Sequence, residues 1–80
     1  MWFLYILECS DGSFYTGITN DLKKRLQRHN SAKASKYTRL RLPVVLIYSE
    51  NLESRSLALK REAQVKRLSR IQKEQLVRKQ

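Results

Sequence analysis

Residues 2–9, WFLYILEC, are apolar on both of the faces that an extended chain presents. Odd positions form one face and even positions form the other, and Glu8 is the one charged residue among them. A strand of this kind is covered on both sides, as in the middle of a sheet. We therefore expect residues 2–9 to form a central β-strand.

The next apolar run, residues 14–18, is predicted to be the return strand of a hairpin. Asp11-Gly12 in the connecting SDGS is a strong signal for a tight turn between two strands. Tyr15 and Gly17 share one face of the return strand. Glycine weakens a strand, so Gly17 indicates a bulge or the close approach of another group, and a substrate backbone is one candidate for that group.

A first helix is predicted after the hairpin. One of residues 19–21, Thr-Asn-Asp, supplies its N-cap, and an aspartate also suits the positive end of the helix dipole. Leu22, Leu26 and His29 recur at helical spacing and form one stripe. Asn30 is the expected end of this helix.

Residues 54–68 are predicted to form a second helix. Ser69 and Gln72 then match a capping box, which predicts that a final helix begins there. The apolar positions expected to face the core are Leu57, Ala58, Val65 and Leu68 in the second helix, and Ile71 and Leu76 in the final helix.

Two segments separate the first and second helices. Residues 44–49, VVLIYS, are rich in β-branched side chains and are predicted to form a third strand. Residues 31–43 have no clean period, are small, polar and basic, and end at Pro43. We expect a functional loop that carries four cations on one mobile segment, namely Lys33, Lys36, Arg39 and Arg41.

The order strand, strand, helix, strand, helix, helix predicts an α+β fold, a three-stranded sheet flanked by helices. A chain of 80 residues has no room for a second core, so residues 1–80 are expected to form one domain. Cys9 is the only cysteine, which excludes a disulfide framework and a structural zinc site and fits a reducing compartment. The N-terminus lacks the features of a signal peptide, and no apolar run reaches the length of a membrane span, so we expect a cytoplasmic protein.

The charge balance indicates a polyanionic partner. Seventeen lysines and arginines face seven acidic residues, which gives a net charge of +10 and a pI near 10.3. Nucleic acid is the first candidate for such a partner. An anionic membrane is the second, but its usual sign is one basic amphipathic helix with aromatic residues on the apolar face, whereas these basic residues spread over the chain.

Three polar side chains lie on or beside the apolar helix faces. Judged by spacing alone, a packed His29 and a surface Glu62 that pairs with Arg61 or Lys66 are the more ordinary interpretations. Arg25 lies one turn before His29, and together they could contact a phosphate. Glu62 borders the buried face of its helix, which makes it a candidate ligand for a hard divalent cation.

Tyr5 and Tyr15 are ordinary strand residues by propensity. A phenol has a pKa of about 10, so a tyrosine that acts as a base needs cationic neighbours, which this sequence supplies. A cysteine–histidine dyad would need Cys9 to meet His29, and Cys9 is expected to be a small core residue. A glycine-rich phosphate loop is excluded, because the sequence has 2 glycines.

Taken together, these residues resemble the GIY-YIG nuclease domain, and in particular the small stand-alone bacterial members of that family. The resemblance runs from Phe3 to Leu68 and into the last helix. Phe3-Leu4 replaces the Gly-Ile of the first motif, and Thr16 replaces the isoleucine of the second. No single segment is specific, but the joint spacing of five segments is: LYI, YTG, DLKKRLQRHN, KYT and LKREAQVKRL.

The resemblance implies an antiparallel three-stranded sheet flanked by helices and the metal-dependent hydrolysis of DNA phosphodiesters, in DNA repair or processing. It implies that Tyr5 orients or deprotonates a water molecule and passes its proton toward Tyr15, His29 or solvent. Arg25 would hold the scissile phosphate. Glu62 would hold a single divalent ion, Mg²⁺ or Mn²⁺.

The same resemblance implies DNA as the partner, with no membrane and no small-molecule cofactor. The glycine of the second motif would let the substrate approach the sheet, and the basic loop would bind flanking phosphates. The residues expected to bind substrate are Gly17, Lys33, Lys36, Tyr37 and Arg39.

Two other functions remain open from the sequence. A non-catalytic nucleic-acid-binding module would keep the fold and the charge, and composition supports it equally. The joint presence of five residues favours the enzyme, namely Tyr5, Tyr15, Arg25, His29 and Glu62. A carboxylate repels phosphate unless a cation lies between them, so a module that only bound phosphate would not need Glu62. A protein-interaction domain that uses residues 2–7 is less favoured, because that run is needed for the core.

Overall fold

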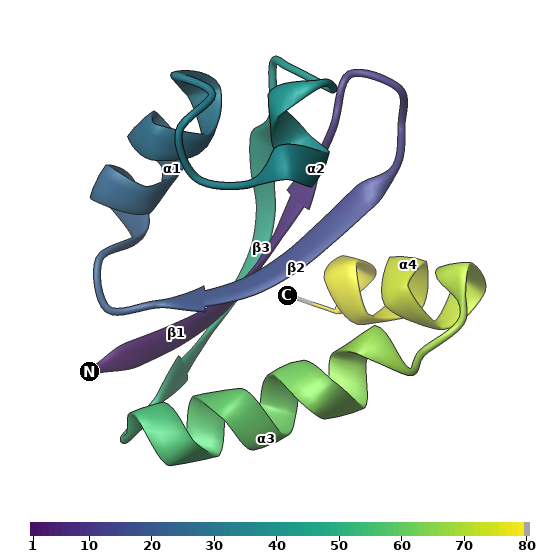
Figure 1. Ribbon diagram of the computed structural model, residues 1–80. Helices are drawn as coiled ribbons and strands as arrows, with labels where there is room; N and C mark the ends of the chain where they lie inside the picture. The colour runs from purple at the N-terminus through teal and green to yellow at the C-terminus, as the bar shows by residue number, and fades with distance from the viewer. Residues whose placement is uncertain (80) are drawn as a thin grey trace.

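Seven helices and strands follow one another along residues 1–79, the part of the chain that the computed structural model describes (Figure 1). They are β1 (Trp2–Glu8), β2 (Phe14–Thr19), α1 (Leu22–Asn30), α2 (Lys36–Arg39), β3 (Val45–Leu52), α3 (Arg55–Lys66) and α4 (Arg70–Arg78).

The strands form an antiparallel sheet in the order β2-β1-β3, so the apolar β1 is central as predicted. Tyr5 pairs with Gly17 on one side and with Ser49 on the other. The pairing of β1 with β3 shifts by one residue between Ile6 and Leu7. Both β2 and β3 are edge strands, and β2 is the edge that concerns the functional site.

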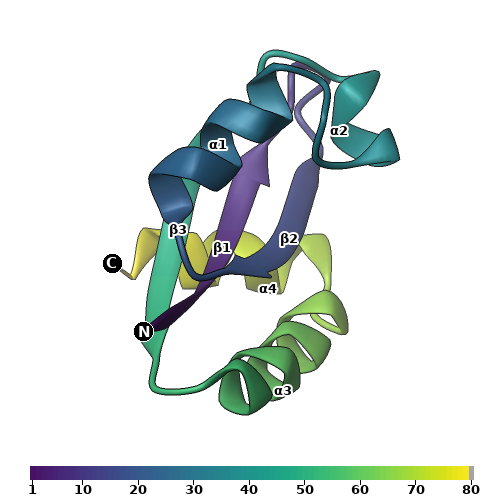
Figure 2. The same cartoon turned by 60° about the vertical axis from the view of Figure 1, so that its left-hand side comes forward.

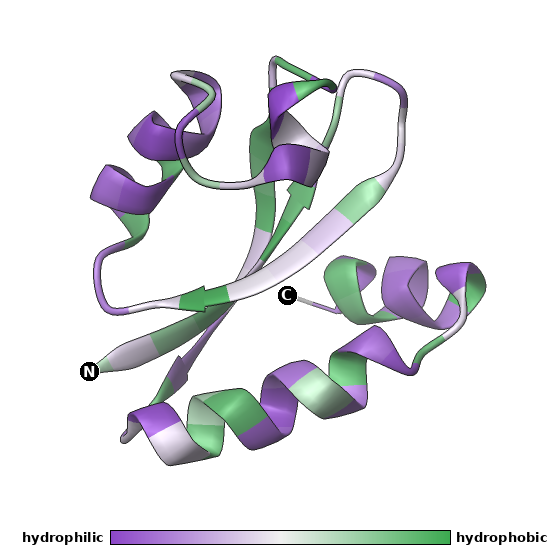
Figure 3. Cartoon of the chain, viewed as in Figure 1, coloured by the Kyte–Doolittle hydropathy of each residue, from purple (hydrophilic) through white to green (hydrophobic). Residues whose placement is uncertain are grey.

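Helices cover both faces of the sheet, with α1 and α2 on one side and α3 and α4 on the other (Figures 1 and 2). On the α1–α2 side, Tyr5, Leu7, Cys9 and Val44 form the buried core. On the α3–α4 side, the core consists of Leu4, Ile6 and Val65. The two alternating sets of β1 therefore fill separate cores. Figure 3 shows green, hydrophobic stretches on β1 and on the first part of β3, and purple, hydrophilic residues along most of α1.

The predicted hairpin turn is confirmed between β1 and β2. Gly12 has a φ of 83°, a left-handed conformation that glycine adopts without strain. Its N–H donates to the Cys9 carbonyl at 2.9 Å, and the Cys9 N–H donates to the Ser13 carbonyl at 2.8 Å. The Asp11 carboxylate accepts from both the N–H and the hydroxyl of Ser13, which closes the turn.

Helix α1 begins and ends where its polar residues predict. Among the three candidate caps, Asp21 serves as the N-cap, since its side chain accepts from the Lys24 N–H at 3.0 Å. Asn30 is the last residue of the helix, and its side-chain amide exchanges two hydrogen bonds with the backbone of Val44. This pair fixes the end of α1 to the start of the third strand, which runs from Val45 rather than from Val44 and extends to Leu52.

The expectation of a loop over residues 31–43 is wrong in part, because this segment contains the short helix α2. Ser35 caps it by accepting from the Tyr37 N–H at 3.1 Å. Arg41 is not free to bind a phosphate, because its guanidinium donates to the Asp11 carboxylate at 3.0 Å and to the Tyr37 carbonyl at 2.8 Å. Thr38 is fully buried. These contacts hold the segment against the hairpin.

Helices α3 and α4 pack against the second core as predicted, with two exceptions. Leu57 is 45% exposed and Ile71 is 66% exposed, so neither belongs to the core. The core is filled from these helices by Ala58, Val65, Leu68, Leu76 and Val77.

The predicted capping box of α4 is present, with Ser69 and Gln72 each bonded to the other's backbone. Arg70 reaches back to the hairpin, where it donates to the Gly12 carbonyl at 2.8 Å and stacks on Phe14. Within residues 1–79, no helix is long and apolar enough to cross a membrane.

Candidate active site

A chain of buried hydrogen bonds crosses the α1–α2 side of the molecule. The Tyr5 hydroxyl lies 2.9 Å from Nε2 of His29, and Nδ1 of His29 lies 2.8 Å from the Thr38 hydroxyl. His29 and Thr38 have no exposed surface. The chain therefore joins three separate elements, β1, α1 and α2, and locks the imidazole in one orientation.

The partners of Thr38 assign the direction of these bonds. Its hydroxyl donates to the Ser35 carbonyl at 3.4 Å, which leaves the hydroxyl oxygen to accept from Nδ1–H of His29. Nε2 then carries a lone pair and accepts the proton of Tyr5. In this arrangement His29 is placed to take a proton from the phenol.

Tyr15 and Tyr37 extend this cluster toward the surface. The Tyr15 ring lies 6.4 Å from that of Tyr5 and 5.2 Å from the imidazole of His29, measured between centroids. Tyr37 stacks on Tyr15 at 6.1 Å, and the Arg41 guanidinium lies 3.8 Å above the Tyr37 ring. The rings form a continuous path from the buried phenol to the outer edge of β2.

The structure gives Gly17 a role that differs from the expected approach of a substrate. A Cβ atom at this position would lie 2.6 Å from the Tyr5 hydroxyl oxygen and 2.7 Å from the ring carbon that bears it. The group that approaches Gly17 is therefore the phenol of its strand partner. Gly17 makes the room in which Tyr5 meets His29.

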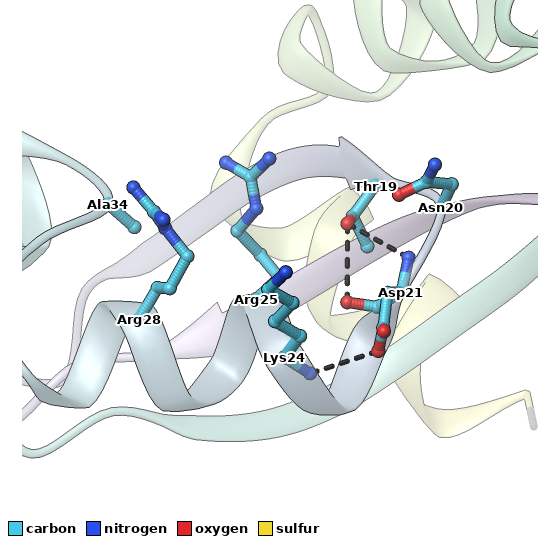
Figure 4. A pocket seen from close by; sticks show the side chains of 7 residues that line it. All are labelled: Thr19, Asn20, Asp21, Lys24, Arg25, Arg28 and Ala34. Atoms are coloured by element: carbon cyan, nitrogen blue, oxygen red, sulfur yellow. Dashed lines mark hydrogen bonds between the residues drawn. The ribbon is translucent and has the colours of Figure 1, made fainter.

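Arg25 projects from α1 into a pocket of about 250 Å³ at the end of β2. Figure 4 shows the guanidinium groups of Arg25 and Arg28 extending from the same side of the helix. The Asp21 carboxylate in this pocket is already bonded as the helix cap. The full lining consists of Thr19, Asn20, Asp21, Lys24, Arg25, Arg28 and Ala34, which makes the pocket cationic and suited to phosphate.

Glu62 lies on α3 and is one of the less exposed carboxylates, with 20% of its side chain accessible. Its Oε2 pairs with Nζ of Lys66 at 3.4 Å. The other predicted partner is wrong, because Arg61 binds both carboxylate oxygens of Glu50 at 2.8 and 2.9 Å. The Tyr48 hydroxyl also donates to Glu50, so Arg61 is held away from Glu62.

The electrostatics link these side chains. Burial raises the pKa of Tyr5 above its ordinary value, and the electrostatic interactions with Tyr15 and Glu62 add to that rise, whereas Arg25 lowers it. Burial and the charge of Arg25 lower the pKa of His29 to about 4. At neutral pH the pair is therefore a neutral phenol beside a neutral imidazole, and Glu62 and Arg25 both act on the phenol.

The donor set fits a cation that is completed by water and phosphate. Among residues 1–79, no group of three or more histidine, cysteine or acidic side chains could hold a metal ion. Among the carboxylates of residues 1–79, Glu62 is the one whose charge raises the pKa of Tyr5, and 20% of its side chain is exposed. Mg²⁺ commonly binds through one or two carboxylates, several waters and substrate phosphates, so a single carboxylate suffices when the substrate is present.

The basic residues of segment 31–43 lie apart from the hydrogen-bonded chain of Tyr5, His29 and Thr38. Lys33, Lys36 and Arg39 are exposed, and none of them lines the pocket beside Arg25. They are placed to contact a polyanion outside the centre. Tyr37 differs from them, because its ring joins the buried aromatic path.

Two contributors were missed by sequence reasoning. Thr38 orients His29, and the signal for it was Ser35, a helix cap three residues before a small hydroxyl residue. Lys73 lies beside Lys66 in a second pocket at the β2 edge. The spacing of residues along the chain does not predict that Lys73 lines this pocket, because its position depends on how α4 folds back against the hairpin.

Comparison with known proteins identifies the family of this chain. A family model described as the GIY-YIG catalytic domain matches residues 1–75. A UPF0213 protein of Halobacterium salinarum is 49% identical over 76 residues, which are 95% of this chain and 99% of the relative. A UPF0213 protein of Streptococcus pneumoniae is 51% identical over 75 residues, which are 94% of this chain and 76% of the relative.

Two solution NMR structures are also similar. The UPF0213 protein BH0048 from Bacillus halodurans has 49% identity and a TM-score of 0.62, and the match covers 96% of this chain and 83% of that one. A protein from E. faecalis has 48% identity and a TM-score of 0.65, and the match covers 96% of this chain and 82% of that one. With a family model over most of its length and relatives at this identity, the chain belongs to the GIY-YIG family.

Proposed function

We propose that this protein is a metal-dependent DNA endonuclease. The observation that carries the proposal is the buried bond between the Tyr5 hydroxyl and Nε2 of His29, with Arg25 and Glu62 both acting on the same phenol. A module that only bound nucleic acid would need neither a buried proton acceptor nor a carboxylate beside it. Membership in a nuclease family supports the same activity.

Each residue of the candidate site has a separate role in the proposed hydrolysis of a phosphodiester. Tyr5 orients the attacking water and accepts its proton as its own proton moves to His29. Thr38 keeps the imidazole in the tautomer that can accept it. Arg25 holds the phosphoryl oxygens through its planar fork of N–H donors. Glu62 would hold the divalent cation, Mg²⁺ or Mn²⁺, which supplies positive charge to the phosphate and the leaving oxygen.

The net charge of +10 supports DNA as the substrate. The exposed side chains of Lys33, Lys36 and Arg39 would contact phosphates that flank the cut, together with the cationic pocket around Arg25. Because such contacts release counterions, affinity for DNA is expected to fall as salt rises.

The test uses the Glu62→Gln variant, with Glu53→Gln as a matched control that removes an exposed carboxylate elsewhere. Each protein is incubated with labelled linear, nicked, flapped and branched DNA in Mg²⁺ or Mn²⁺. We expect the parent and the control to cut at least one substrate, and Glu62→Gln to bind that substrate without cutting it. If Glu62→Gln cuts as fast as the parent, the metal assignment is wrong. If the parent binds every substrate and cuts none, the protein is a binding module.

A further inference from the structure

A second pocket lies at the free edge of β2, at the opposite end of the strand from Arg25. Its volume is about 230 Å³. In Figure 2, α2 and the junction between α3 and α4 both border this edge of the sheet. The residues that line the pocket come from all of these elements and are Phe14, Tyr15, Thr16, Tyr37, Lys66 and Lys73.

The lining combines two ammonium groups with aromatic walls. Lys66 and Lys73 supply the positive charge, and none of the described lining residues is acidic. Tyr37 is held firmly, because Tyr15 stacks on its ring and the Arg41 guanidinium lies 3.8 Å above it. A nucleotide matches this chemistry, since its phosphate suits the lysines, and its sugar and base suit contact with aromatic walls that Arg41 and Arg70 already hold in place.

The pocket is also adjacent to the candidate centre. Tyr15 lines the pocket and, within the fold, contacts the imidazole of His29 at 5.2 Å between centroids. Lys66 lines the pocket and pairs with Glu62. A DNA strand that follows the edge of β2 would therefore meet Arg25 near one end of the strand and this pocket near the other.

Resting on the proposed nuclease function, we propose that this pocket binds one nucleotide of the DNA strand beside the cut, and that its phosphate draws Lys66 away from Glu62. A contact between Lys66 and the phosphate would compete with the pair that Lys66 makes with Glu62. In the free protein its ammonium neutralises the Glu62 carboxylate at 3.4 Å, and 56% of its side chain is exposed. Exposed pairs of this kind are weak, so the lysine exchanges readily.

The movement of Lys66 from Glu62 to the phosphate couples the binding of DNA to the binding of the divalent cation. When Lys66 turns to the phosphate, the Glu62 carboxylate is freed for a divalent cation. The coupling is reciprocal, because whatever favours the free carboxylate also favours the lysine in the pocket. Lys66 therefore disfavours metal binding in the absence of DNA and supports it when the strand is in place.

The first experiment measures affinity for fluorescein-labelled duplex DNA by anisotropy in EDTA, where no metal contributes. Lys66→Gln and Lys73→Gln are compared with Lys60→Gln, an exposed lysine on α3 outside the pocket. We expect the two pocket variants to bind about fivefold more weakly and to lower the salt slope by about one, with less change in the control. Equal losses in all three variants would overturn the phosphate site.

The second experiment measures Mn²⁺ binding by electron paramagnetic resonance in the absence of DNA. Lys66→Gln is expected to bind Mn²⁺ about threefold more tightly than the parent, because the competing ammonium is gone. Lys73→Gln and Lys60→Gln are expected to bind like the parent. If Lys66→Gln and Lys60→Gln behave alike, Lys66 is an ordinary surface partner.

The two proposals fail in different ways. If the parent cuts DNA while the pocket variants match Lys60→Gln, the pocket proposal fails and the nuclease stands. If the pocket variants lose DNA affinity in EDTA but the parent cuts no substrate, the phosphate site stands and the nuclease proposal fails.

Discussion

The two faces of the central sheet are filled in different ways. On the α3–α4 side, the buried cluster of Leu4, Ile6 and Val65 is entirely apolar. On the α1–α2 side, a polar chain from Tyr5 through His29 to Thr38 runs through the interior. An apolar cluster loses stability in proportion to the volume removed, whereas a buried polar chain fails when one partner is lost. The apolar cluster therefore supports the fold, whereas the polar chain is the buried part that the proposed chemistry uses, together with Glu62 from α3.

The largest expected effect is on the rate of DNA cutting, and it comes from a residue of the polar chain. Tyr5→Phe removes the hydroxyl on which the proposed proton transfer depends, so single-turnover cutting should fall by about 10²–10⁴-fold. The free energy of unfolding should fall by only about 1–3 kcal/mol, because Nε2 of His29 is left without its partner. Rapid-quench cutting assays and urea unfolding measure the two quantities. A variant that cuts at the parent rate would remove Tyr5 from the mechanism.

The second expected effect is a loss of stability without a change in the rate of DNA cutting. Leu4→Ala leaves a cavity in the apolar cluster and should lower the free energy of unfolding by about 2–5 kcal/mol. The folded fraction should cut DNA at the parent rate, because Leu4 faces away from the polar chain. Leu57→Ala, at an exposed position of α3, is the control and should change stability little. Equal losses from both variants would contradict the assignment of the core.

The smallest of the three effects depends on pH. The pKa of His29 is lowered to about 4 by burial and Arg25, so the folded protein keeps the imidazole neutral while the unfolded chain protonates it near the ordinary value of 6.5. Stability is full above that value and falls as pH drops toward 4, by up to about 3 kcal/mol in total.

Urea unfolding between pH 6 and pH 5 isolates this contribution. Hydrogen bonds from Ser13 lower the pKa of the Asp11 carboxyl, and hydrogen bonds from Arg61 and Tyr48 lower the pKa of the Glu50 carboxyl, so both remain ionised over that range. His29 is the only histidine of the sequence. His29→Gln should therefore flatten the slope, and an unchanged slope would show that another group binds the proton.

The fold was largely predictable because its signals are local. The two-faced apolar run of β1, the Asp-Gly turn and the Ser69 capping box each act over a few residues, and the structure contains all three. Predictions failed where tertiary contacts decide, and two of them show the reason. Helix α2 depends on Ser35 and on the clamp of Arg41, and Leu57 has helical spacing but no neighbour that would bury it.

The candidate site was predictable as a set of residues but not as an arrangement. Spacing placed His29 on a helix face and Tyr5 on a strand, yet the bond between them joins positions 24 residues apart. The role of Gly17 also depends on register, since only the pairing with Tyr5 shows which group needs the space. Family resemblance grouped Tyr5, His29 and Gly17 in one site, but it assigned Gly17 to the approach of a substrate rather than to the space that Tyr5 occupies.

The contact of Arg70 with the first hairpin has a consequence for the order in which the protein is made. Its guanidinium donates to the Gly12 carbonyl across 58 residues of sequence and covers the ring of Phe14. During synthesis the hairpin leaves the ribosome long before α4 exists. The turn before β2 therefore keeps the Gly12 carbonyl in water and the Phe14 ring uncovered until Arg70 has been made.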